Sequence, residues 1–168
     1  MDITHLLLEI HGRIPPLVRA AVEDLDAEQL VWRPGREANS IGWLVWHLTR
    51  VQDHHMAELV ADDQIWVTGE WAESFSLTPD PSNTGYGHAA DEVASVRPVS
   101  PEALVDYHDA VNARTVAMLA KLAPADLDRI VDRRWDPPVT MGVRLVSIAD
   151  DCLQHAGQAL YVRGLLQN

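Results

Sequence analysis

Residues 147–166 read SIADDCLQHAGQALYVRGLL, and the spacing of the apolar residues in this stretch decides the fold. Together with the residues just before it, the stretch has one side chain facing inward at every third or fourth position, a spacing typical of a helix with one buried stripe. The stripe consists of Leu145, Ile148, Cys152, His155, Ala159, Val162 and Leu166. A histidine lies within the stripe and an aspartate, Asp151, lies beside it, where leucines would pack better.

Three earlier segments have the same helical periodicity, so four helices are predicted. They cover residues 3–21, 41–60, 101–122 and about 141–166. Good N-cap residues precede the second and third helices at Asn39-Ser40 and Ser100, and the fourth begins near Thr140. Pro15-Pro16 interrupts the first segment and should kink the helix or restart its first turn. The fold class predicted is all-α, a four-helix bundle.

Two irregular connections elaborate this bundle. Residues 68–100, rich in glycine, proline and serine, lie between the second and third helices and contain at most a short helix around Ala90 to Val96. We expect this long connection to cover one end of the bundle, because long ordered connections often carry function. Residues 130–142 predict a short extended piece before the last helix. Nothing divides the chain, so residues 1–168 are interpreted as one domain.

Composition limits the partners and the compartment. The chain has 13 Lys and Arg against 25 Asp and Glu, a formal charge of -12, which repels nucleic-acid backbones and anionic lipid surfaces. There is no secretory signal pattern and no apolar run of ~18 residues, so we expect a cytoplasmic protein with no membrane span. The single cysteine, Cys152, excludes an intramolecular disulfide and a cysteine-based zinc cluster, and its place on the stripe favours a small buried side chain.

The pair formed by Asp151 and His155 indicates a metal site. Residues four apart on a helix differ by about 40° in direction and about 6 Å in height, so both side chains can reach one ion. His47 lies beside the apolar stripe of the second helix and offers a third ligand from a facing helix. Two histidines and a carboxylate with open coordination positions are typical of catalytic zinc, nickel, iron or manganese. The alternative is that these residues make ordinary polar contacts in the core.

The segments NSIGWLVWHLTRVQ (residues 39–52) and DDCLQHAGQALYVRGLL (residues 150–166) resemble the DinB-like superfamily of four-helix-bundle metalloproteins. The chain is particularly similar to an actinobacterial branch related to mycothiol-dependent maleylpyruvate isomerase and mycothiol S-transferases. The resemblance implies a divalent metal, most simply zinc, held by His47, Asp151 and His155. Many relatives have histidine or glutamate where this chain has the shorter Asp151.

Other residues are weaker candidates. His54, one to two helical turns beyond His47, is a candidate proton shuttle or general base, and Gln158 is a candidate donor to a water or substrate. Aromatic and basic residues in or beside the irregular segments are candidates for walling a pocket or for binding an anionic substrate or the polar end of a thiol cofactor. These candidates are Trp66, Trp71, His88, Arg134, Trp135 and Arg144. The alternative for each of them is a structural role in packing, in a surface loop or in a surface ion pair.

The functional hypothesis is therefore a metal-dependent enzyme. By resemblance, mycothiol is the expected thiol cosubstrate, activated for transfer to a small electrophile or for thiol-assisted isomerisation. One alternative is a hydrolase that uses metal-bound hydroxide, with His54 as the only candidate base. Another is a metal-binding, stress-associated protein without turnover, since one scaffold hosts several activities. A homodimer is plausible by analogy.

Overall fold

The computed structural model describes residues 1–167, and almost all of its regular structure is helical. The longer helices are α1 (Ile3–His11), α2 (Ile14–Val22), α4 (Ile41–Val60), α7 (Pro101–Leu119) and α8 (Met141–Leu166). The short ones are α3 (Ala27–Val31), α5 (Ile65–Thr68), η1 (Ala72–Phe75), α6 (Ala90–Ser95) and η2 (Pro124–Asp128). Two short strands, β1 (Ile130–Asp132) and β2 (Val139–Thr140), precede α8. The all-α prediction is confirmed.

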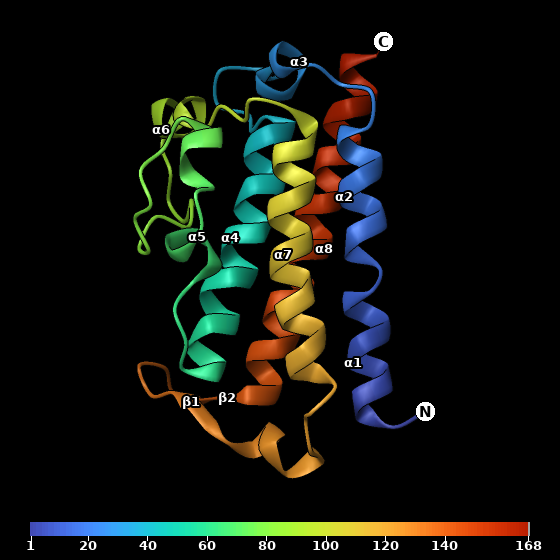
Figure 1. Ribbon diagram of the computed structural model, residues 1–168, viewed down its shortest axis with the longest axis vertical. Helices are drawn as coiled ribbons and strands as arrows, with labels where there is room; N and C mark the ends of the chain where they lie inside the picture. Colours follow the sequence, from blue (N-terminus) through green and yellow to red (C-terminus); the bar gives the residue numbers. More distant parts are fainter. Residues whose placement is uncertain (168) are drawn as a thin grey trace.

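Four columns of helix run side by side, with α1 and α2 stacked end to end as one of them (Figure 1). Helix α4 packs against both α8 and α7, and α2 packs against α8. Most residues of α4 are buried, including polar ones, because the long connection that follows it covers a further face. The core is therefore built around α4, and its contact with α8 brings residues of the second and fourth predicted helices together.

The helix starts follow the sequence. Side-chain oxygens of Ser40, Ser100 and Thr140 accept hydrogen bonds from the backbone N–H three residues later, as N-cap residues do. The double proline stands in the first turn of α2, where its missing N–H costs nothing, so it separates α1 from α2. The first predicted helix is thus two helices, in agreement with a restart at Pro15-Pro16.

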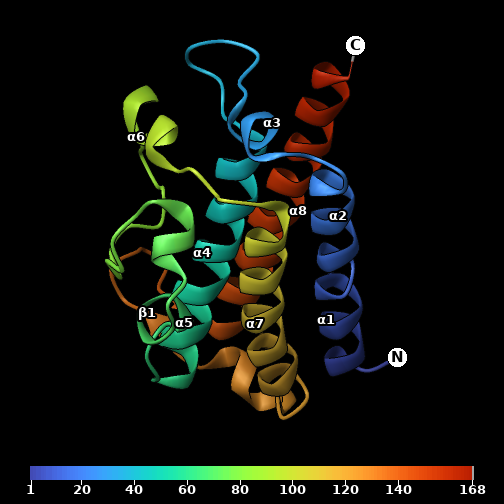
Figure 2. The same ribbon diagram turned by 45° about the horizontal axis from the view of Figure 1, so that its top comes forward.

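The prediction that the long connection covers one end of the bundle is wrong. The connection runs along the flank of α4. Figures 1 and 2 show α5 beside α4 and α6 near its N-terminal end. The connection is held there because Trp66 is fully buried and its ring packs edge-on to Trp46 of α4, at 6.1 Å between centroids. The predicted short helix is present as α6.

The extended piece before the last helix is a small antiparallel hairpin. Ile130 pairs with Thr140 and Asp132 pairs with Val139, so the loop between the strands carries Arg133, Arg134 and Trp135. This hairpin lies at the end of the bundle where α8 begins (Figure 1). Within residues 1–167, no helix is both long enough and apolar enough to cross a membrane.

The core contains two fully buried histidines, His11 on α1 and His108 on α7. Neither ring nitrogen of His11 has a partner among the described residues, and Nε2 of His108 also has none. The Thr49 hydroxyl donates to the Val45 carbonyl, so it accepts from Nδ1 of His108 at 3.3 Å. Burial lowers the pKa of each histidine to about 4. Both imidazoles are therefore neutral core groups at pH 7.

This burial predicts that the protein loses stability in mild acid. In the unfolded chain a histidine takes up its proton near pH 6.5, whereas these two do so only near pH 4. The unfolded state therefore binds more protons between these values, and the free energy of unfolding falls as the pH falls through this window, by roughly 3 kcal/mol per histidine. Urea unfolding of metal-free protein at several pH values measures this. In His11→Leu the slope should be shallower, and an unchanged slope would contradict the explanation.

Candidate metal centre

The packing of α4 on α8 brings His47, Asp151 and His155 together. One ligand atom from each lies within 4.8 Å of the other two. Nε2 of His155 is 3.6 Å from Oδ1 of Asp151, and the rings of His47 and His155 meet edge to face at 4.8 Å between centroids. His47 is buried, while Asp151 and His155 are partly exposed, so His155 lies at the margin of the core stripe instead of its middle. The three residues predicted as ligands thus form one group.

In both His47 and His155, a hydrogen bond at Nδ1 decides which ring nitrogen is free to bind a metal. Nδ1 of His47 donates to the Thr84 carbonyl oxygen at 2.5 Å, and Nδ1 of His155 donates to Oε1 of Gln158 at 2.8 Å. In the neutral ring the other nitrogen, Nε2, then carries the lone pair. This is the usual arrangement of metal-binding histidines, whose second nitrogen is held by an oxygen acceptor. Gln158 is thus a positioning residue for His155.

Asp151 supplies the test of whether a cation fits. Its Oδ2 is buried and has no hydrogen-bond partner among residues 1–167, a costly arrangement for a carboxylate. Burial raises the pKa of Asp151, against the opposing effect of His155. The other oxygen, Oδ1, lies 3.6 Å from Nε2 of His155, so a buried carboxylate without a donor stands beside a nitrogen that carries a lone pair, and no described residue places a positive charge between them. A divalent cation meets this need, so the residues fit a metal.

His47 is prepared as a neutral ligand by its surroundings. Burial is the main cause that lowers its pKa to about 4, so the imidazole is unprotonated at neutral pH. The Trp43 ring stacks on it at 4.6 Å between centroids, with an interplanar angle of 13°. Trp43 in turn donates from Nε1 to Nδ1 of His88, at 3.2 Å. The ring of His47 is therefore held on one face and at Nδ1.

The backbone that meets His47 belongs to residues 83–88, which we call the strap. Gly85 in the strap has a φ of +91°, and a Cβ added there would lie 2.7 Å from Nδ1 of His47. Any side chain would therefore collide with the ligand ring as well as strain the backbone. The strap is closed by His88, whose Nε2 donates to Oδ1 of Asn83 at 3.0 Å. Sequence analysis did not predict Thr84 or Gly85, because the first acts through its carbonyl and no pattern places the second beside His47.

Two buried charges of α4 anchor the chain that follows it, and one of them, Arg50, holds the strap. Arg50 donates from Nε to the Asn83 carbonyl and from Nη2 to Gln64 and the Pro81 carbonyl. Asp53 accepts from the backbone N–H groups of Ile65 and Trp66 at 2.9 and 2.8 Å. Both side chains are fully buried. Sequence analysis missed them, although a charged pair three residues apart on an apolar helix is a detectable signal.

A second group of possible ligands, His54, His55 and Glu58, is satisfied without a metal. Gln64 donates from Nε2 to Nδ1 of His54, since its Oε1 is occupied by Arg50. Nε2 of His54 then carries the proton and faces Glu58 at 3.5 Å.

His55 is used in the same way. It donates from Nδ1 to Glu58 at 3.0 Å and accepts at Nε2 from Arg144 at 3.3 Å. Each imidazole lone pair in this second group already has a donor, in contrast to those of His47 and His155. The first group is therefore the candidate metal centre.

A cavity of about 310 Å³, here named the metal pocket, opens on the candidate centre. Its lining consists of His47, Val51, His54, His55, Thr84, Tyr86 and Asp151. His54 and His55 are not members of the ligand group of His47, Asp151 and His155, yet they line the same pocket. Burial is the main cause that lowers the pKa of His54, so this imidazole is neutral at pH 7.

The other predicted contact residues divide into three sets. Trp66 and Trp71 pack against Tyr107, with ring centroids 5.3 and 5.5 Å away, and Trp66 is fully buried, so it forms core and walls no pocket. His88 serves the strap. A separate cavity of about 380 Å³ is lined by Arg134, Trp135 and Arg144 together with His55 and Asp132.

Cys152 is fully buried, and its thiol donates to the Leu48 carbonyl at 3.5 Å. Burial raises the pKa of this thiol well above its ordinary value. The thiol is therefore neutral and enclosed, as its place on the apolar stripe predicts.

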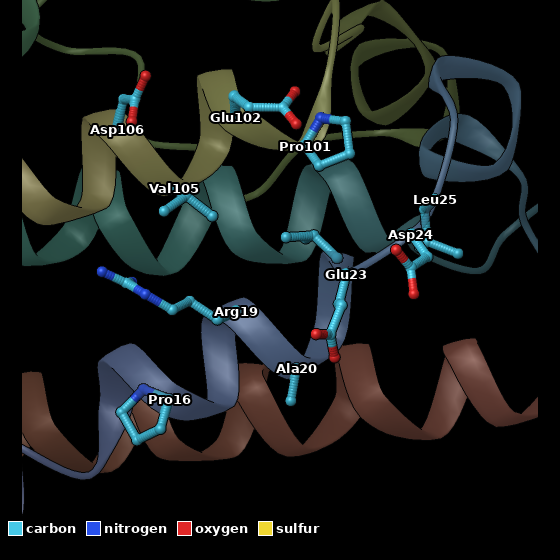
Figure 3. Close-up of a pocket in the computed structure, with 11 residues that line it drawn as sticks. Pro16, Arg19, Ala20, Glu23, Asp24, Leu25, Pro101, Glu102, Val105 and Asp106 are labelled. Carbon is cyan, nitrogen blue, oxygen red and sulfur yellow. The ribbon is translucent and has the colours of Figure 1, made fainter.

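A larger cavity, of about 820 Å³, lies between α2 and α7, away from these residues. Figure 3 shows four carboxylates around it, from Glu23, Asp24, Glu102 and Asp106. Its one arginine, Arg19, forms an ion pair with Asp109 at 2.7 Å. None of the candidate metal ligands lines this groove.

Comparisons with known proteins agree with this fold. A family model described as the DinB superfamily matches residues 13–159. The crystal structure of a conserved protein from Enterococcus faecalis is similar, with a TM-score of 0.91 and 32% sequence identity. The match covers 99% of this chain and 98% of that chain. No curated protein matches the chain. Similarity over the full length of both chains shows a shared fold and assigns no activity.

The lone-pair assignment predicts which substitutions remove the metal. His47→Ala, Asp151→Asn and His155→Ala should each lower bound zinc, after repletion and dialysis, from near one equivalent to a small fraction, because a site with two ligands binds weakly. His54→Ala and His55→Ala are matched controls, because both residues lie on α4 like His47, and these variants should keep the metal. Elemental analysis measures the content. Loss of zinc in the two controls with retention in the first three would place the ion in the second group.

The strap predicts a loss of metal affinity without any change of ligand. Gly85→Ala should weaken zinc binding about 10- to 100-fold, the usual cost of disturbing a residue that orients a ligand. Gly87→Ala is the control, because its φ is +76° but an added Cβ has nothing within 4 Å. It should carry only the backbone strain, ~1 kcal/mol of stability. Competition with a chromophoric chelator measures affinity, and equal weakening in both variants would contradict the contact with His47.

Proposed function

The chain belongs to the DinB superfamily, and on this premise we propose that it is a divalent-metal-dependent enzyme that activates a low-molecular-weight thiol. The thiol would be transferred to a small electrophile or would assist an isomerisation. The observation that carries the proposal is the group of His47, Asp151 and His155, with two free imidazole lone pairs and a buried carboxylate oxygen that lacks a donor.

Three protein ligands leave a coordination position open, which distinguishes a catalytic site from a structural one. A divalent cation held by His47, Asp151 and His155 would lower the pKa of a thiol or water that reaches the open position. Zinc is the first choice for two imidazoles and one carboxylate, and nickel, iron and manganese accept the same donors.

The protein's own side chains support an external thiol. The chain has one cysteine, and that thiol is buried, hydrogen-bonded to Leu48 and of raised pKa, so it is unsuited to act as a nucleophile. The metal pocket is large enough for a cysteinyl group, with Val51 as an apolar wall and the 93% exposed Tyr86 at its mouth. Mycothiol, which the sequence resemblance predicts, is the first thiol to test.

Metal-dependent hydrolysis is the second candidate, and His54 is the observation in its favour. This neutral imidazole lines the metal pocket and is the nearest candidate for a general base. The lone pair on Nδ1 of His54 already accepts a hydrogen bond from Gln64 at 3.0 Å, so this nitrogen could take up a proton only after that hydrogen bond breaks. Thiol activation needs no such base, and we therefore rank it first. A metal-binding role without turnover is the remaining alternative.

The proposal predicts that thiol binding requires the metal. In isothermal titration, zinc-loaded protein should bind mycothiol, and metal-free wild type or His155→Ala should bind it at least tenfold more weakly. A panel of small electrophiles should then be consumed only when both metal and thiol are present. Turnover of esters with metal and no thiol would replace this proposal by hydrolysis. Metal binding without thiol binding or turnover would leave the non-catalytic role.

A further inference from the structure

The metal pocket has a neighbour on the side of the β1–β2 hairpin. This second cavity, here named the hairpin pocket, has a volume of about 380 Å³ and is lined by His55, Asp132, Arg134, Trp135 and Arg144. His55 also lines the metal pocket, so one side chain forms a wall of both cavities. The two cavities are therefore adjacent.

One carboxylate holds two guanidinium groups in the hairpin pocket. Arg134 donates from Nε and Nη2 to the two oxygens of Asp132, at 2.9 and 2.8 Å. Arg144 donates from Nη2 to Oδ2 of the same aspartate, at 2.9 Å. The backbone N–H of Arg134 also donates to Asp132, at 2.9 Å. Both arginine heads are therefore held in place before a ligand arrives, which lowers the entropic cost of binding.

The two guanidinium groups have only one carboxylate, Asp132, within ion-pair distance among residues 1–167. Two guanidinium groups share a single carboxylate, and that carboxylate is buried while the Arg134 side chain is 76% exposed. Nη1 of Arg134 has no protein partner among residues 1–167, so it remains a donor for a ligand. A guanidinium group presented in this way suits a planar anion such as a carboxylate.

An exposed aromatic ring stands beside these arginines. Trp135 is 66% exposed, although burying a tryptophan is normally favourable. Its place in the wall of the hairpin pocket gives it a use as a contact for the less polar part of a ligand that also carries charge. The ligand expected here combines an anionic group with an organic framework, unlike a simple inorganic ion.

Glu58 opposes the arginines from α4. Asp132 is the main cause that raises the pKa of Arg134, and the carboxylate of Glu58 adds a smaller contribution; Glu58 also accepts a hydrogen bond from His55. Glu58 therefore competes electrostatically with an incoming anion without blocking the free donor of Arg134. Its removal should strengthen anion binding, whereas removal of Arg134 should weaken it.

We propose that the hairpin pocket binds a carboxylate of the thiol cosubstrate whose sulfur occupies the metal pocket. Arg134 is the principal contact, Arg144 and Asp132 position it, and Trp135 packs against the organic part of the ligand. This inference rests on the proposed thiol function. It deepens that function, because it specifies a thiol that carries a free carboxylate. Mycothiol, whose cysteine carboxyl group is part of an amide bond, lacks such a group, so the inference predicts an acidic thiol in place of mycothiol as the cosubstrate.

The test uses glutathione, a thiol with two carboxylates, and its diethyl ester as a matched probe. Isothermal titration into zinc-loaded wild type should show glutathione binding about tenfold more tightly than the diester. The overall charge of the protein is -12, which favours the ester, so a preference for the acid reports on the pocket. Equal affinities, or a tighter ester, would overturn the proposal.

Arg134→Gln should reduce the preference for the acid to about twofold or less, as loss of an exposed charged hydrogen bond implies. Arg133→Gln is the matched control, since this neighbouring exposed arginine changes the net charge equally and does not line the pocket. Glu58→Gln should increase the preference. The same effect in Arg133→Gln as in Arg134→Gln would show a general charge effect and overturn the assignment.

A further arm separates this inference from the thiol function. S-methylglutathione lacks a free thiol, so its binding to metal-free protein depends on the hairpin pocket alone. Weakening by Arg134→Gln and not by Arg133→Gln would support the carboxylate site even if the metal centre fails its own test. If zinc and thiol bind as proposed while Arg134→Gln changes neither probe, the thiol function stands and the carboxylate site falls.

Discussion

The buried pair of Arg50 and Asp53 on α4 is the interaction on which the site depends. Both side chains are fully buried, and each is satisfied mainly by the chain that follows α4. Arg50 binds the Asn83 and Pro81 carbonyls and lies over the Trp66 ring at 5.0 Å, and Asp53 binds the first N–H groups of α5. A buried charge that loses its partners is strongly destabilising. The long connection is therefore held against the flank of α4 by hydrogen bonds to two buried charges as well as by apolar packing.

This anchoring has a chemical consequence at the candidate metal centre. Because Asn83 is tied to Arg50, the next residue places its carbonyl on Nδ1 of His47, and Gly85 passes close over the ring. The proton of His47 is thus directed to Nδ1, and its Nε2 is left as a donor to a metal. A loop carbonyl far from His47 in the sequence thereby determines which atom of an α4 side chain can coordinate.

The two histidine groups near the metal pocket show why residue type alone does not define a metal site. Both groups contain two imidazoles and a carboxylate whose ligand atoms lie close together. In the group of His54, His55 and Glu58, Gln64 and Arg144 donate to the imidazole nitrogens that would coordinate. In the group of His47, Asp151 and His155, the outer nitrogens act as donors and the inner ones remain free. The difference lies in the neighbours, which decide the direction of each hydrogen bond.

The sequence by itself determined the long helices, the N-cap residues of α4, α7 and α8 and the set of candidate ligands, but not the short helices α3, α5, η1 and η2. Apolar periodicity is a local property, as is an N-cap such as Ser40, Ser100 or Thr140, so both can be read along the chain. Asp151 and His155 were paired by helical spacing alone, because residues four apart share a face. The same local reasoning placed the proline break between α1 and α2.

Only the tertiary structure decided which groups are free to act. The pairing of His47 with α8, the course of the long connection and the burial of Trp66 depend on contacts between residues far apart in sequence. The roles of Arg50, Asp53 and Thr84 depend on them as well. A lone pair is free or used according to the donor that faces it, and no periodic pattern encodes that neighbour. The chemistry of this site is therefore set by long-range hydrogen bonds, whereas its residues are set by short-range spacing.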